Sequence, residues 1–359
     1  MAKHQLFLVH GMGAYDKDWS LDAKQALLDA FGRYSLSKAM GLAGQFDFVE
    51  INYNDIFEEI RAIWKENAAE AAGALAALGL ADSAANRLVE LADVGTRDDF
   101  LRTHALDVVM YRFMKPISQR VSQSVRLQIL SRLQAFPQND QPSWSILGHS
   151  LGTSVVNDTL HAMFTQTVDG SVLGDRAKPD FVFMVANVAR LLWNKGGDFY
   201  SSVVRPHTVD SLGICWKYCN FTHALDPFPM VDAFDPPAQW FPDGTTTAQR
   251  PIFLFDGEIP ARDVQDVNVH GLTHYLSHPS VHSEIINTLA GFQVVTQTEV
   301  NTALREWRED TLPAQALKKV QDLLRENTAV PSNWKKIIDM LFNIRSEVLA
   351  SSKLKDGEG

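Results

Sequence analysis

The chain has 359 residues, of which 45% are hydrophobic, and this content is enough to bury a large globular core. Its formal net charge at pH 7 is −10 and it has no dense run of Lys or Arg. This charge pattern argues against nucleic acid or an anionic membrane surface as a partner. No apolar stretch approaches the length that spans a bilayer, so a transmembrane segment is not expected.

The N-terminal residues and the cysteines favour a cytoplasmic location. Residues 6–9 are apolar, but this run is too short for the core of a signal peptide and no small-residue cleavage site follows it. Cys215 and Cys219 are the only cysteines. On one strand they would lie roughly 13 Å apart, too far to form a disulfide. Two free thiols favour a reducing compartment; secretion without an N-terminal signal stays open as the alternative.

Five short apolar runs predict buried parallel strands, because hydrophobic residues occupy both faces and turn signals follow. They span residues 6–9, 46–53, 144–147, 181–185 and 214–221. Helical patterns separate them, and after Ser150 the apolar residues recur with the spacing of one helix face. Strands that alternate with helices predict a mainly parallel, doubly wound α/β sheet.

Two regions fall outside that alternation. Residues from about 55 to 140 form a predicted helical insertion, in which Pro116 begins a helix with apolar residues at four-residue steps. Residues 68–80 are rich in Ala and Leu; we favour a buried helix there, and an apolar cap or lid is the alternative. We therefore predict one domain over residues 1–295 and a helical C-terminal extension over residues 296–359.

The extension ends in an amphipathic helix predicted over residues 334–349. Its apolar residues at helical spacing are Ile337, Ile338, Leu341 and Ile344. Docking on the core is the favoured role for this helix. Pairing in a homo-oligomer and contact with lipid are the alternatives.

A Gly-x-Ser-x-Gly motif follows the third predicted strand. Residues 144–147 read as a strand and Leu151 begins a helix, which is the setting in which a serine is held exposed on a sharp turn. Gly148 and Gly152 leave room for the strand and the helix to approach each other. We therefore predict that Ser150 is a nucleophile. The alternative is a glycine-bounded turn with a surface serine.

The segment Gly148-His149-Ser150-Leu151-Gly152 resembles the lipase and esterase form of the nucleophile elbow in the α/β-hydrolase superfamily. The resemblance covers residues from about 5 to 290. It implies an α/β-hydrolase fold and a serine hydrolase activity that needs no cofactor.

A second motif, His10-Gly11-Met12-Gly13, directly follows the first predicted strand. Acyl transfer passes through an oxyanion that two backbone N–H groups must stabilise. The resemblance implies that Met12 and Leu151 supply them. The glycines let the loop bend so that an amide faces inward, and His10 is predicted to hold the loop. A phosphate-binding turn is the alternative, but the glycine and Lys-Ser/Thr pattern of such turns is missing.

A serine nucleophile needs a histidine base and a carboxylate that orients it. In this fold the acid follows a late strand. Residues 222–229, Thr-His-Ala-Leu-Asp-Pro-Phe-Pro, resemble the acid loop of class-3 lipases, which have Val where this chain has Phe228. The resemblance implies Asp226 as the acid. Asp232 and Asp235 are rivals, and an ordinary turn aspartate before proline is the alternative.

Four histidines beyond the acid are candidates for the base, at four-residue steps: His270, His274, His278 and His282. In similar hydrolases the base precedes the last helix and lies close to an aromatic residue. His274, next to Tyr275, fits that pattern and is the predicted base; His270 is the alternative. For the other two histidines, capping or solvent-facing roles are predicted.

The spacing of these histidines also suggests metal ligands on one helix face. Gly271 and Pro279 interrupt such a helix, and no His-Glu-x-x-His arrangement occurs. We therefore predict no metal.

These residues predict hydrolysis of a small-molecule or lipid-like carboxylic ester through an acyl-enzyme. A thioesterase or an amidase with the same residues is the first alternative. A non-catalytic binding protein of this fold is the second.

Overall fold

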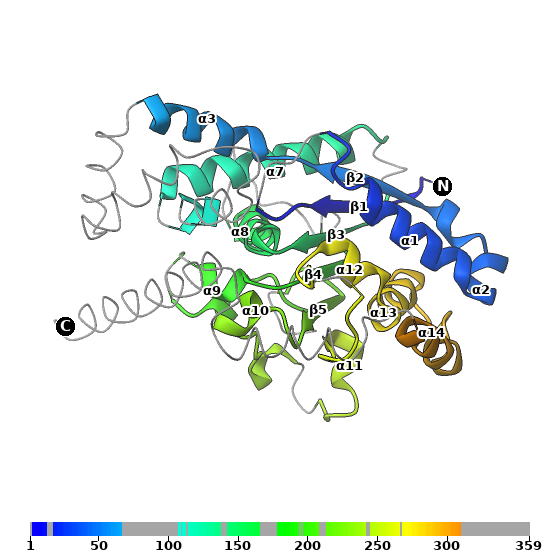
Figure 1. Ribbon diagram of the computed structural model, residues 1–359. Helices are drawn as coiled ribbons and strands as arrows, with labels where there is room; N and C mark the ends of the chain where they lie inside the picture. The colour runs from blue at the N-terminus through cyan, green and yellow to red at the C-terminus, as the bar shows by residue number, and fades with distance from the viewer. Residues whose placement is uncertain are drawn as a thin grey trace.

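The central feature of the protein is a parallel β-sheet (Figure 1). The computed structural model describes residues 2–12, 17–66, 107–108, 110–112, 114–137, 142–165, 178–193, 195, 197–207, 213–241, 245–265 and 268–309. Within these residues, six strands pair in the order β2-β1-β3-β4-β5-β6, and every pair is parallel. The strands are β1 (His4–Val9), β2 (Phe46–Ile51), β3 (Trp144–His149), β4 (Phe181–Val185), β5 (Lys217–His223) and β6 (Leu254–Ile259). The predicted α/β class is confirmed.

Helices flank both faces of the sheet (Figure 1). One face packs against α3 (Asn54–Glu66), α7 (Lys115–Gln134) and α8 (Leu151–Thr165). The other packs against α1 (Leu21–Arg33), α12 (Leu272–Ser277), α13 (Pro279–Ala290) and α14 (Gln297–Glu309). The shorter elements are α2 (Ser35–Ala39), α9 (Ala189–Leu192), α10 (Pro227–Val231), α11 (Arg250–Phe253) and 3₁₀ turns at Leu42–Gln45, Phe199–Ser201 and Ala238–Trp240.

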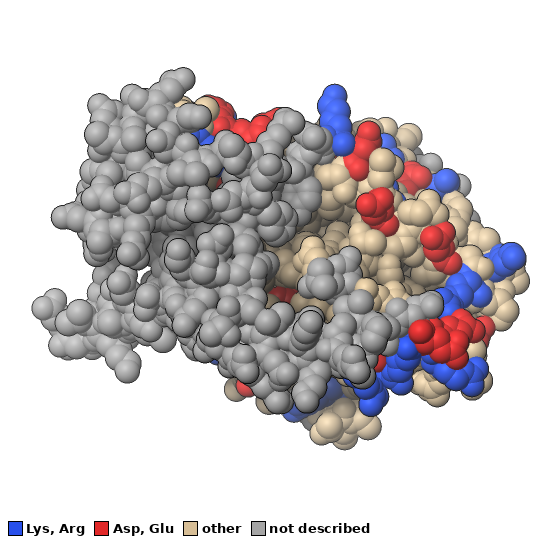
Figure 2. All heavy atoms as spheres, viewed as in Figure 1, with Lys and Arg blue, Asp and Glu red and all other residues tan. Residues whose placement is uncertain are grey.

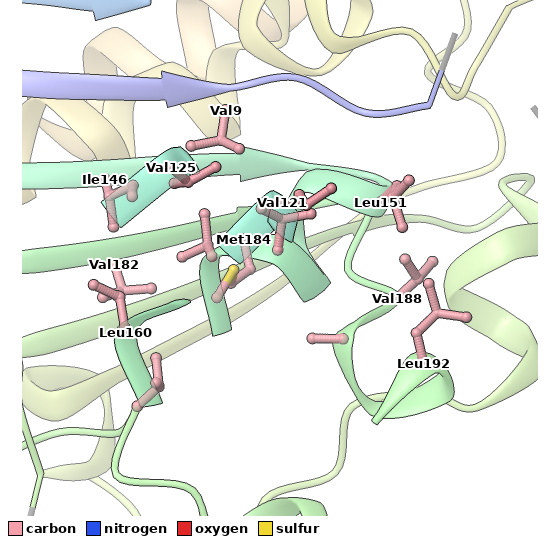
Figure 3. Close-up of a cluster of buried hydrophobic side chains, with 14 of the residues drawn as sticks. Val9, Val121, Val125, Ile146, Leu151, Leu160, Val182, Met184, Val188 and Leu192 are labelled. Carbon is pink, nitrogen blue, oxygen red and sulfur yellow. The ribbon is translucent and has the colours of Figure 1, made fainter. Parts of the chain in front are cut away.

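The continuous apolar run of β1 is explained by burial on both faces. Phe7 and Val9 belong to the core beneath α7 and α8, whereas Leu6 and Leu8 belong to the core beneath α1 and α13. Successive side chains of a strand point to opposite faces, so each core receives alternate residues. Figure 3 shows the first core, where Val9 lies among valines of α7 and residues of β3 and β4.

Two strands differ from the prediction. The strand expected to begin at Ile214 begins at Lys217, because Cys215 forms an isolated bridge with Pro206 before β5 starts. The cysteines therefore do not share one strand, and both are buried and free. The edge strand β6 was not predicted, because Asp256, Gly257 and Glu258 break its apolar pattern.

The helical insertion and the extension are described in part. The helix predicted from Pro116 is α7, and its predicted apolar face is buried. Residues 68–80, where a buried helix is predicted with a lid as the alternative, and residues 334–349, where an amphipathic helix is predicted, lie outside the described residues. No helix in the described part of the chain is long and apolar enough to cross a membrane. Acidic and basic side chains are interspersed over the described surface in Figure 2.

Candidate active site

The candidate site lies where β1, β3, β5 and β6 end. Because the strands are parallel, their carboxyl ends meet at one edge of the sheet, where ligands bind in open α/β sheets. Gly11 follows β1, Ser150 follows β3, Asp226 follows β5, and His270 lies between β6 and α12. The topology thus gathers motifs that lie far apart in the sequence.

Ser150 occupies a strained turn between β3 and α8. Its φ angle is +53°, in the left-handed region that a non-glycine residue rarely adopts, at a cost of the order of 1–3 kcal/mol. Two neighbours hold this conformation. The Ser150 N–H donates to the Val185 carbonyl of β4 (3.0 Å), and the Ser150 carbonyl accepts from the N–H (2.9 Å) and hydroxyl (2.6 Å) of Thr153.

The glycines around Ser150 sit at close backbone approaches. A Cβ on Gly152 would lie 2.3 Å from the His10 carbonyl oxygen, and one on Gly148 would lie 2.8 Å from the Gly152 carbonyl oxygen. A Cβ on Gly11 would lie 2.9 Å from the Cβ of Ser150. The end of β1, the turn and the start of α8 can therefore pack together only with small residues at these positions.

A chain of hydrogen bonds joins Ser150 to Asp226 through His270. The Ser150 hydroxyl donates to His270 Nε2 (2.8 Å), and His270 Nδ1–H donates to Asp226 Oδ2 (2.8 Å). The side chains of Ser150, His270 and Asp226 are all buried. This is the arrangement in which an imidazole can remove the hydroxyl proton while a carboxylate fixes its tautomer.

Asp226 is an ionised carboxylate surrounded by donors. Oδ2 also accepts from the Tyr275 hydroxyl (2.8 Å), and Oδ1 accepts from the Phe228 N–H (3.1 Å). Burial raises the pKa of Asp226, but His270, Tyr275 and Phe228 outweigh that effect and hold the pKa below its usual value. The carboxylate therefore keeps its charge although its side chain is buried.

His149 contacts His270 from the side of the Ser150 turn. Its Nε2–H donates to the His270 carbonyl (2.7 Å), and the two imidazole rings lie 5.1 Å apart. Burial lowers the pKa of His149 to about 3, so the ring is neutral at pH 7. His149, which precedes Ser150, thus anchors the backbone of His270.

The structure places His270, the alternative base, between Ser150 and Asp226, and it places His274, the predicted base, beside Gln265, His223 and Trp307. His274 Nε2 accepts from the Gln265 N–H (3.5 Å), and its ring packs against His223 and Trp307. The reason lies in where α12 begins. Helix α12 starts at Leu272, so His274 projects from a helix while His270 lies on the preceding loop.

The remaining predicted residues have structural partners. His278 caps α13 by accepting from the Ser280 N–H (3.3 Å). His282 is buried rather than solvent-facing, and its Nε2 accepts from the Tyr34 hydroxyl (2.7 Å). Of the rivals to Asp226, Asp232 pairs with Arg190 (3.2 Å) and Asp235 donates its N–H to the Tyr200 hydroxyl (2.6 Å).

The loop after β1 is held in place by aromatic and polar contacts. His10 Nδ1–H donates to the Gly11 carbonyl (2.8 Å), its ring stacks on Tyr53, and the Tyr53 hydroxyl donates to the His10 carbonyl (2.6 Å). Met12 is buried beside this anchor, while Gly13 lies outside the described residues. Leu151 is the first residue of α8, where helix geometry leaves N–H groups without an intrahelical acceptor.

Two residues of the site were not assigned these roles from the sequence. Tyr275 was predicted to mark the base, but its hydroxyl binds the acid. His149 was predicted only as part of the motif. Their contacts span 49 and 121 residues, so local spacing carries no signal for them. Within the described residues, no group of three or more His, Cys, Asp or Glu side chains is placed to hold a metal ion.

Comparisons with protein-family models, curated proteins and solved structures gave no significant match to this chain.

Proposed function

We propose that the protein is a serine hydrolase of the α/β-hydrolase kind that cleaves carboxylic esters. The observation that carries the proposal is the hydrogen-bonded chain Ser150–His270–Asp226, with Ser150 held at positive φ on a strand–helix turn. A left-handed serine at the carboxyl edge of a parallel sheet is strained, and such strain clusters at functional sites.

In the proposed reaction, Ser150 Oγ attacks the acyl carbon while His270 Nε2 takes its proton. The Met12 and Leu151 N–H groups stabilise the oxyanion. The C–O bond of the ester then breaks, and His270 returns the proton to the leaving alcohol. Water next attacks the acyl-enzyme, again giving its proton to His270, and the acid is released with Ser150 restored. Asp226 stabilises the imidazolium in both steps.

Apolar side chains lie on both sides of the Ser150–His270 pair. The Leu151 side chain is buried at the end of the core cluster that Val188 and Leu192 also occupy (Figure 3). The Phe228 ring packs on the His270 ring at 4.6 Å. The preference for an ester of a hydrocarbon acid rests on the resemblance of the elbow and the acid loop to lipases and esterases.

The proposal is tested with p-nitrophenyl esters from acetate to palmitate, together with a thioester and an anilide. The wild type should hydrolyse the esters, and Ser150→Ala should lower kcat on the order of 10⁴-fold or more. Ser154→Ala is the matched control, because Ser154 is also a buried serine, lies on α8 just after the turn and donates to the Val188 carbonyl. A wild type inactive on every ester, or a Ser150→Ala variant of unchanged turnover, would contradict the proposal.

A further inference from the structure

Helix α14 contacts the segment that carries His270. This segment, residues 260–271, connects β6 to α12 and is called the base loop here; residues 260–265 and 268–271 of it are described. The contacts come from Trp307 and Arg308 in the last turn of α14. The helix belongs to the extension that the hydrolase resemblance does not cover.

Arg308 makes a two-point contact with the base loop. Its Nε donates to Asp263 Oδ1 (2.8 Å) and its Nη2 donates to Asp263 Oδ2 (3.0 Å). The Asp263 side chain is fully buried, and its backbone N–H closes a turn onto the Pro260 carbonyl (2.9 Å). A planar guanidinium that binds both oxygens of a carboxylate fixes its orientation as well as its charge.

Asp263 depends on these partners to stay ionised. Burial raises its pKa, but His278, whose Nε2 lies 3.5 Å from Oδ2, and Arg308 more than offset this and hold the pKa well below its usual range. A buried carboxylate that loses its partner is strongly destabilised. The start of the base loop is therefore tied to the end of α14.

Trp307 makes the second contact. Its carbonyl accepts from Gln265 Nε2 (3.1 Å), and its ring packs edge-on against His278 and His274. At its far end the base loop is held by the bond from His149 to the His270 carbonyl. The two ends of the loop are thus fixed by different elements, α14 and the serine elbow.

We propose that α14 is a positioning element for the base: through the Arg308–Asp263 pair it holds the base loop so that His270 stays between Ser150 and Asp226. This inference rests on the proposed function. It gives the C-terminal extension an indirect role in the reaction. The hydrogen bonds of α14 described above go to Asp263 and Gln265 rather than to Ser150, His270 or Asp226.

The experiment compares Arg308→Met with Glu306→Gln. Glu306 lies on the same turn but pairs with Arg33 of α1 at the surface, so its substitution removes a contact of α14 that does not involve the base loop. In full-length protein, Arg308→Met should increase hydrogen–deuterium exchange of the base-loop amides and lower kcat for p-nitrophenyl ester hydrolysis by about 10–100-fold, with KM within about threefold. Glu306→Gln should change neither, and Arg308→Lys should give an intermediate kcat.

The outcomes separate this inference from the proposed function. Equal base-loop exchange in Arg308→Met and Glu306→Gln, or raised exchange with unchanged kcat, would overturn it. If Arg308→Met does not fold, Asp263→Asn/Arg308→Met replaces it, because that pair removes the uncompensated charge and still lacks the two-point contact. A wild type without ester hydrolysis would overturn the positioning role together with the proposed function. In that case, faster base-loop exchange in Arg308→Met than in Glu306→Gln would show that the Arg308–Asp263 pair stabilises the loop without a role in ester hydrolysis.

Discussion

The His270→Ala variant is expected to lose ester hydrolysis, with kcat reduced on the order of 10⁴-fold or more. His270 Nε2 accepts a hydrogen bond from the Ser150 hydroxyl, and His270 Nδ1–H donates one to Asp226. Without it, the hydroxyl has no base and attack requires an alkoxide that hardly exists at neutral pH. Steady-state kinetics with a p-nitrophenyl ester measures the loss.

His274→Ala is the matched control for that measurement. It removes an imidazole four residues away that is also buried, but whose ring packs on His223 and Trp307. Its kcat should stay within about tenfold of the wild type. The reverse pattern, with His274→Ala inactive and His270→Ala close to wild type, would show that His274 is the base and that His270 is not.

The Asp226→Asn variant is expected to lower kcat by about 10⁴-fold although it keeps the shape of the side chain. Three donors face the two oxygens of Asp226: His270 Nδ1–H, the Tyr275 hydroxyl and the Phe228 N–H. An asparagine has one oxygen, so its amide nitrogen must face at least one of these donors. When it faces His270, the ring takes the tautomer whose Nε2 carries a proton and cannot accept another from Ser150.

Two variants control for the effect of Asp226→Asn. Tyr275→Phe removes one donor but keeps the carboxylate and its bond to His270, so its loss should be at most about tenfold. Asp232→Asn removes the rival carboxylate, which pairs with Arg190, and should leave kcat unchanged. An Asp226→Asn variant as active as Asp232→Asn would remove Asp226 from the proposed site.

The serine elbow is predictable from the sequence because its constraints are local. A strand, a turn and a helix follow one another within about twenty residues. Gly148 and Gly152 lie so close to neighbouring backbone atoms that larger residues would not fit there. The proposed acid was also indicated locally, since Asp226 follows a strand and caps the start of α10 at Pro227.

The base could not be chosen in the same way. His270 and His274 are both buried, both lie near the start of α12, and differ by one helical turn. What separates them is where α12 begins relative to the edge of the sheet, and that depends on β6. This strand was not predicted because an edge strand with acidic residues and a glycine lacks the apolar run of a buried parallel strand.

The aromatic residue used to choose His274 has a different role. Tyr275 lies beside the site, but it binds the carboxylate rather than marking the base. The contacts of α14 with the base loop likewise join residues 42 to 45 positions apart, and no periodicity in the sequence encodes them. Pairwise contacts of this kind become visible only once the topology is known.

Covalent labelling with a fluorophosphonate tests the central claim most directly. Folded wild-type protein is treated with the probe, digested, and the modified residue is located by mass spectrometry. A single adduct on Ser150, missing from heat-unfolded protein and formed much more slowly in His270→Ala, is the predicted result. No adduct on the folded protein, or an adduct on another residue with Ser150 unmodified, would contradict the assignment of Ser150 as the nucleophile.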